Sequence, residues 1–198
     1  ADFIFHQMMQ NFEEAQLGED DYEIRVTRGF TLLEAQPINV VPNQQVRDYR
    51  QAATPVSDTR KQVFGGFKKC CYTLQKFDSD PERRLAVLLE QEKNVEKWIK
   101  PGRDQFKIEC RSGEGYEPDF VIETDKAMII AEVKAANEMT DPIVLAKAQA
   151  AAKWCKIANQ QAKTASTKPW NYLLIPDTAV LGNATLDGLA SSYSRLSN

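Results

Sequence analysis

The sequence predicts an α/β domain in which helices flank a mixed β-sheet, with the order helix, strand, strand, strand, helix, strand from Ser79 onward. Two observations predict this class. Apolar residues recur at helical spacing in two long segments, and short runs of β-branched and large apolar residues lie between and after them. A short polar loop joins two of the strands, which makes them antiparallel, whereas a strand reached through a helix returns parallel to its predecessor.

The first predicted helix begins after Ser79, a residue suited to cap it. Pro81 is tolerated in a first turn, and Glu82 stands three residues after Ser79, as in a capping box. Apolar residues then recur at helical spacing as far as Pro101-Gly102, the predicted end of the helix; they are Leu85, Leu88, Leu89, Val95 and Ile99.

Three strands are predicted between the helices. Residues 105–111 alternate apolar and polar side chains and form the first strand. Residues 120–122 and 128–131 are apolar throughout, as in buried strands, and the polar residues 123–126 between them are few enough for a hairpin loop. We therefore expect the start of one hairpin strand to lie beside the end of the other.

The second predicted helix begins at Asp141-Pro142, with Asp141 as its cap. Its buried face is expected to carry Ala146, Ala150, Trp154 and Ile157. The apolar residues 172–175 then form the last strand, and residues 186–196 form a final short helix.

Residues 1–63 differ in character from the rest of the chain and include an acidic stretch. We interpret them as an N-terminal connecting segment, residues 64–198 as the principal domain, and the whole chain as a fragment of a longer protein. Outside the core elements, the sequence predicts strands at 22–27, 30–41 and 67–74 and a polar, proline-flanked loop at 42–55.

Composition argues against several classes of protein. The chain has 198 residues, a net charge of -3 and a single histidine, so a His-based triad or a His-rich zinc site is not expected. The four cysteines show no metal-ligand spacing, and no apolar run is long enough to span a membrane, so we expect a cytoplasmic protein. Positive charge is concentrated after residue 125, where 8 basic and 5 acidic side chains contrast with 17 and 23 before it.

Three charged residues stand at the ends of the predicted hairpin strands. Asp119 precedes the first strand, and Glu132 and Lys134 follow the second, two residues apart and therefore on one face. Folding the hairpin brings two carboxylates and an amine together, a combination suited to binding Mg²⁺ for phosphodiester hydrolysis. The alternative is a surface hairpin in which Lys134 pairs with either acid in solvent.

These three residues, with Pro118, resemble the motif of the PD-(D/E)xK nuclease superfamily, whose restriction-endonuclease-like core has the order αβββαβ. Over residues 64–176 the chain resembles the C-terminal endonuclease part of type III restriction enzymes, which follows an ATP-dependent motor. The matching motifs are residues 77–82, Val95-x-x-Trp98, Tyr116-x-Pro118-Asp119-Phe120, Glu132-Val133-Lys134, and Lys147-Ala148 followed by Trp154.

The resemblance implies a DNA endonuclease that uses Mg²⁺, with Mn²⁺ as a substitute. Asp119, Glu132 and the backbone carbonyl of Val133 would hold the ion, and Lys134 would position the attacking water. The implied partners are DNA, the motor domain of the parent protein and a methyltransferase subunit. No phosphate loop of the G-x-x-x-x-G-K-[ST] type is present in the sequence, so we do not expect this chain to hydrolyse ATP.

Several roles stay open from the sequence. Glu82 either reaches the metal or only completes the capping box. Tyr116 and Trp154 are expected to pack, the first beside the site and the second in the core. The second candidate function is a non-cleaving DNA-binding module with a nuclease fold, and the third is a purely structural domain. A polar stripe on the second helix either contacts phosphates or is a solvated face; it comprises Gln149, Lys153, Lys156, Gln160 and Lys163. Lys147, on the same helix, is a further candidate for DNA contact.

Overall fold

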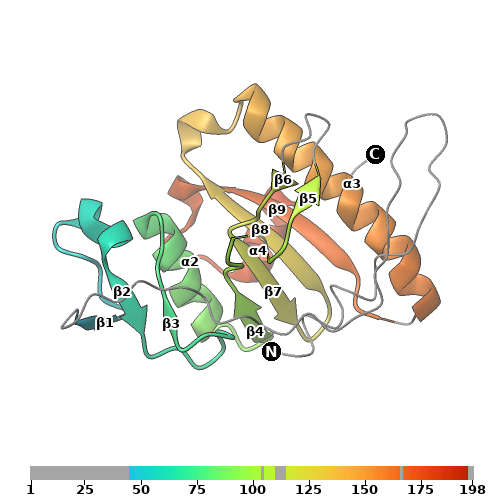
Figure 1. Cartoon of the computed structure of the whole chain (residues 1–198). Coiled ribbons are helices and arrows are strands. Elements are labelled where there is room, and N and C mark those ends of the chain that lie inside the picture. The colour runs from blue at the N-terminus through green and yellow to red at the C-terminus, as the bar shows by residue number, and fades with distance from the viewer. Residues whose placement is uncertain (1–44, 104, 110–114, 166, 196–198) are drawn as a thin grey trace.

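Two mixed β-sheets flanked by helices make up the part of the chain that the computed structural model describes, residues 45–103, 105–109, 115–165 and 167–195 (Figure 1). The four strands of the larger sheet, in spatial order, are β4 (Val95–Ile99), β7 (Phe120–Thr124), β8 (Met128–Lys134) and β9 (Trp170–Pro176). The strand β7 is antiparallel to both of its neighbours, β4 and β8, whereas β8 and β9 are parallel to each other. The predicted hairpin and the predicted last strand are therefore confirmed.

The first helix, α2 (Asp80–Gln91), begins as predicted but ends earlier. The backbone N–H of Glu82 donates to Ser79 Oγ (3.4 Å), which is the expected cap. Val95 and Ile99, which we assigned to this helix, belong instead to β4. A spacing of four residues fits a strand as well as a helix. The pairing of β4 with β7 shifts register between Val95 and Lys97, and this bulge places Val95 and Trp98, three residues apart, in the same core.

Within the strand predicted at 105–111, residues 105–107 are not part of a strand and β5 (Ile108–Glu109) pairs with β6 (Gly115–Tyr116) in a separate two-stranded sheet; residues 110–111 lie outside the described residues. β4 takes the place of the predicted strand in the larger sheet. The elements of that sheet and its two long helices therefore follow one another in the order α2, β4, β7, β8, α3 (Pro142–Ala165), β9. The structure thus has the predicted order of helices and strands, but the first of the three strands is β4 and not the segment 105–111.

Helices cover both faces of the larger sheet, with α3 on one side and α2 on the other (Figure 1). α4 (Leu186–Tyr193), the predicted final helix, packs on the same side as α2. Successive residues of β8 enter different cores, since Ala131 and Val133 belong to the α2 side and Ile130 to the α3 side. Glu132 shares its face with Ile130 and therefore lies on the α3 side.

α3 packs through small side chains, and the buried face we predicted for it was only partly right, because Ala150 and Trp154 pack against the core without being fully buried. Ala146 is exposed, whereas Trp154 lies half-buried at the margin, edge-on to Trp170 with ring centroids 4.9 Å apart. Small residues let the helix lie close to the sheet. The larger Trp154 does not fit between the two and lies at the edge of the interface between helix and sheet. No helix in the described part of the chain is long and apolar enough to cross a membrane. The buried residues of α3 are Ala148, Ala151, Ala152, Cys155 and Ala158.

A smaller three-stranded sheet lies on the α2 side of the molecule. The carbonyl oxygen of Tyr49, just after its first strand, accepts a hydrogen bond from Arg83 Nη1 of α2 (2.9 Å). Two predictions were wrong in this region. A strand, β1 (Val46–Asp48), lies within the loop predicted at 42–55, and of the strand predicted at 67–74 only Leu74 belongs to a strand. The strands predicted at 22–27 and 30–41 lie outside the described residues. The elements are β1 (Val46–Asp48), η1 (Val56–Lys61), β2 (Val63–Gly65) and β3 (Leu74–Gln75).

The carboxylate of Glu90 explains why residues 67–73 do not form a strand. Glu90, near the end of α2, accepts hydrogen bonds from the backbone N–H groups of Lys68 (2.8 Å), Lys69 (3.0 Å) and Cys70 (3.1 Å). It also accepts from Trp98 Nε1 at 2.9 Å. Three successive backbone donors are thus used by one side chain, and the segment pairs with β4 only through one bridge between Cys70 and Trp98 among the described residues.

We expect Glu90→Ala to lower the free energy of unfolding by about 3 kcal/mol, because four donors lose a charged acceptor and Trp98 is fully buried. Urea unfolding followed by tryptophan fluorescence measures this loss. Glu138→Ala, which removes an exposed carboxylate, is the matched control and should change the unfolding free energy little. Equal stability of the two variants would contradict the role assigned to Glu90.

Candidate functional site

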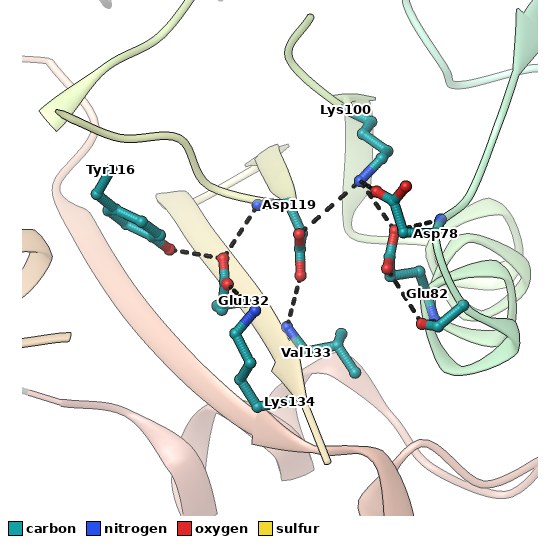
Figure 2. A network of polar contacts seen from close by, with 9 residues as sticks. Asp78, Glu82, Lys100, Tyr116, Asp119, Glu132, Val133 and Lys134 are labelled. Carbon is teal, nitrogen blue, oxygen red and sulfur yellow. Dashed lines mark hydrogen bonds and ion pairs between the residues drawn. The ribbon is translucent and has the colours of Figure 1, made fainter. Parts of the chain in front are cut away.

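The hairpin of β7 and β8 places Asp119 beside Glu132, as the sequence predicted (Figure 2). Phe120 pairs with Ala131, so the residue before Phe120 stands opposite the residue after Ala131. The backbone N–H of Asp119 donates to Glu132 Oε2 (3.2 Å), and the N–H of Val133 donates to Asp119 Oδ2 (2.9 Å). Each carboxylate is therefore anchored to the backbone of the other strand.

Glu132 is held by side chains as well as by the backbone. Its Oε2 accepts a hydrogen bond from the hydroxyl of Tyr116 (2.8 Å), and its Oε1 pairs with Lys134 Nζ (2.7 Å). The side chain of Glu132 is 6% exposed, whereas that of Lys134 is 30% exposed. Lys134 thus links a buried carboxylate to the solvent-facing side of the site. The pair is therefore not the fully solvent-exposed ion pair of the alternative interpretation, because the Glu132 side chain is buried.

Tyr116 has a more specific role than the packing we expected. It comes from β6, outside the larger sheet, and its buried ring lies edge-on to Tyr172 with centroids 6.4 Å apart. Burial, and then the negative charge of Glu132, raise the pKa of the Tyr116 hydroxyl well above its ordinary value. The hydroxyl therefore stays protonated and keeps donating to Glu132.

The pKa of Asp119 reflects its burial and the crowding of carboxylates at the site. Burial, reinforced by repulsion from Glu132, raises the pKa of Asp119 to about 6, although Lys100 and the N–H of Val133 act in the opposite direction. Burial and the neighbouring carboxylate thus disfavour the ionised form of Asp119. A bound cation would relieve that repulsion.

Lys100 is the site residue that sequence reasoning missed. It directly follows β4, and its Nζ lies 2.9 Å from Glu82 Oε2, 3.2 Å from Asp78 Oδ2 and 3.8 Å from Asp119 Oδ1 (Figure 2). We had placed this residue at the end of a long helix, where it would have had no part in the site. The signal in the sequence was weak, because Lys100 follows only two apolar residues, which are themselves preceded by two charged residues.

Glu82 reaches back to the residues that cap α2 and also faces the site. Its Oε1 accepts from Ser79 Oγ (3.1 Å), and its Oε2 accepts from the backbone N–H of Asp78 (3.2 Å) and from Lys100. Burial raises the pKa of Glu82, while the ammonium group of Lys100 lowers it. Lys100 contacts both Glu82 and Asp119, so the ammonium group connects the two carboxylates.

The donor set is of the kind that Mg²⁺ and Mn²⁺ bind. Asp119 and Glu132 offer carboxylate oxygens, and the carbonyl of Val133 faces the same side as its N–H, which already donates to Asp119. Asp78, Glu82, Asp119 and Glu132 against Lys100 and Lys134 leave a formal charge of -2 when all six are ionised. The described residues contain no preformed group of three or more His, Cys, Asp or Glu side chains arranged around a metal position. Carboxylates and backbone oxygen would therefore hold an ion together with water.

The predicted stripe on α3 lies apart from these carboxylates. Gln149, Lys153 and Lys156 are exposed, on a different side of the helix from the alanines that face the sheet, and Gln160 is exposed as well. Lys147 is half-buried, and the side chain of Lys163 lies outside the described residues. The structure brings Asp119, Glu132, Val133, Lys134 and Glu82 into one network (Figure 2).

No family model matches the sequence, and no curated protein is similar to it at a significant level. The resemblance to PD-(D/E)xK nucleases therefore stays an expectation, and the functional conclusion depends on the geometry and chemistry of the site.

Proposed function

We propose that this chain is a Mg²⁺-dependent endonuclease domain that hydrolyses phosphodiester bonds in DNA. One observation carries the proposal: a buried pair of carboxylates, Asp119 and Glu132, is fixed at the end of a hairpin with the ammonium group of Lys134 2.7 Å from Glu132. The order of elements around the larger sheet supports the same assignment, because it matches the αβββαβ order of the PD-(D/E)xK core.

Each residue has a distinct task in this proposal. Asp119 and Glu132, with the carbonyl of Val133, hold the divalent ion, which supplies an acidified water and offsets the charge of the phosphate. Lys134 orients the attacking water and stabilises the charge that develops on the phosphate. Burial tends to lower the pKa of Lys134, but Glu132 and then Asp119 raise it above its ordinary value. Lys134 is therefore protonated and acts by positioning and charge, not as a general base.

The proposed context is that of a type III restriction enzyme. The domain would receive DNA from the motor domain of its parent protein and act in a complex with a methyltransferase subunit. The exposed residues of α3 would supplement the phosphate contacts, since Lys153 and Lys156 follow one another along one side of the helix. Few basic residues take part, so binding to DNA by this chain alone should be weak, in the range of roughly 10⁻⁴ to 10⁻⁶ M.

A non-cleaving DNA-binding module is the second candidate. It is favoured by the absence, among the described residues, of a preformed group of three metal-ligand side chains, and by the hydrogen bonds that already occupy Glu132. In such a module Lys134 and Lys100 would only balance buried negative charge.

Nicking of supercoiled plasmid at low ionic strength separates the two candidates. We expect slow nicking by the wild-type chain with Mg²⁺ or Mn²⁺, none with EDTA, and none by Glu132→Gln, which excludes a contaminating nuclease. Glu123→Gln is the matched control, because Glu123 is also a buried acid of the hairpin that pairs with a lysine, Lys168 (2.8 Å). Intact binding of Mn²⁺ and DNA without any nicking would support the non-cleaving module instead.

The raised pKa of Asp119 predicts a pH dependence for metal binding. Protons and cations compete for this carboxylate, so affinity for Mn²⁺ should rise with pH up to about 6 and level off above it. Below pH 6 one displaced proton corresponds to a change of about tenfold per pH unit. Isothermal titration between pH 5 and 8 measures this profile. Affinity that does not vary between pH 5 and 7 would show that Asp119 is not a ligand.

A further inference from the structure

Lys100 occupies a position that the proposed function does not yet explain. β4 and β7 are antiparallel, with Ile99 opposite Val121, so the residue after β4 lies beside the start of β7 and reaches Asp119. The side chain of Lys100 is 14% exposed and lies among three carboxylates, at 2.9 Å from Glu82, 3.2 Å from Asp78 and 3.8 Å from Asp119. A buried ammonium group at this place adds positive charge where a cation is expected to bind.

The two carboxylates that Lys100 connects are held very differently. Both oxygens of Glu82 are engaged, by Ser79 Oγ, by the N–H of Asp78 and by Lys100 itself. Asp119 is anchored through Oδ2, whereas its Oδ1 has Lys100 at 3.8 Å, which is too far for a direct hydrogen bond. Asp119 Oδ1 can therefore accept a further ligand. An ion at Glu82 would compete with Lys100, which is 14% exposed and lies among three carboxylates, whereas the lysine that pairs with Glu132 is 30% exposed and can turn towards solvent.

We propose, on the basis of the function proposed above, that Lys100 is a positioning residue that keeps Glu82 out of the metal coordination. Its ammonium group retains Glu82 as a partner and offsets part of the charge of Asp119. Glu82 therefore acts on the site through Lys100, and the metal is held by Asp119, Glu132 and the carbonyl of Val133. This assignment differs from the ligand role that the sequence had left open for Glu82.

The assignment predicts that removal of Lys100 strengthens metal binding. In Lys100→Met the positive charge next to Asp119 is gone and Glu82 becomes available to the ion, so affinity for Mn²⁺ should increase at least about tenfold at pH 7.5. Lys100→Arg keeps the charge and should bind Mn²⁺ like the wild type. A residue with a purely structural role would leave the affinity unchanged or reduce it.

Isothermal titration of the 198-residue chain with MnCl₂ tests this prediction. Lys168→Met is the matched control, because Lys168 also pairs with a buried acid, Glu123, but at the opposite end of the hairpin. If Lys100→Met does not fold, the double variant Lys100→Met with Glu82→Gln removes both charges of the pair. Since this double variant also frees Asp119 from its neighbouring cation, it should still bind Mn²⁺ more tightly than the wild type.

The outcomes separate this inference from the proposed function. Tighter binding by the variants without Lys100, with unchanged binding by Lys168→Met, supports the positioning role. Affinity equal to or weaker than that of a metal-binding wild type overturns the role of Lys100 and leaves the proposed function in place. A wild-type chain that binds no Mn²⁺ overturns the proposed function and this inference with it.

Discussion

Replacing Glu132 by Gln should reduce Mg²⁺-dependent cleavage by at least about 100-fold, and Asp119→Asn should have an effect of the same size. Each change removes one negative charge from the proposed ligand set and keeps the shape of the side chain. Cleavage is best measured under single-turnover conditions with enzyme in excess, because weak DNA binding then affects the rate least. The same variants should lose affinity for Mn²⁺ in isothermal titration.

The control for this prediction is the matched buried acid at the other end of the hairpin. Glu123 is 2% exposed and pairs with Lys168, so Glu123→Gln disturbs a similar ion pair away from the site. We expect cleavage by Glu123→Gln to remain close to that of the wild type. A comparable loss in Glu123→Gln and Glu132→Gln would mean that activity reports the general stability of the hairpin, and would contradict the assignment of Glu132.

Lys134→Met should lower the cleavage rate by at least about 100-fold while Mn²⁺ binding persists. Lys134 is not a ligand in our account, and its ammonium group contributes positive charge near the reacting phosphate. Removing it also removes the partner of Glu132 Oε1, so affinity for the ion should stay the same or rise. Kinetics with and without the substitution, together with isothermal titration, separate these two effects.

A loss of metal affinity in Lys134→Met as large as the loss in Asp119→Asn would contradict the positioning role of Lys134. Such a loss would assign Lys134 to the support of the ligands and not to the reaction. Lys134→Arg offers a second check, because it keeps the charge with a different shape and should retain part of the activity. Full activity of Lys134→Met would remove this residue from the mechanism.

The centre of the site could be predicted from the sequence because it depends on local pairing. A short polar loop between two apolar runs determines a hairpin, and the hairpin alone brings Asp119 to Glu132. Alternation along a strand then places Lys134 on the face of Glu132. The cap of α2 was equally local, since Ser79 and Glu82 are three residues apart.

Features that depend on distant contacts could not be predicted in the same way. The bulge in β4 brings Val95 and Trp98, three residues apart, into one core, so the strand that positions Lys100 lacks the usual alternation of apolar and polar residues. Residues 67–73 contain apolar side chains of strand type, but their backbone donors pair with Glu90 of α2. The orientation of α3 followed from the close approach of small side chains to the sheet, which outweighed the burial of the larger Trp154.

The most direct test of the central claim is an anomalous difference map from a crystal of this chain soaked in MnCl₂. Our account predicts one strong peak at bonding distance, about 2 to 2.5 Å, from oxygens of both Asp119 and Glu132. The carbonyl of Val133 should be a further ligand, and Glu82 should remain paired with Lys100. A peak elsewhere, or no peak between Asp119 and Glu132 at saturating Mn²⁺, would contradict the account.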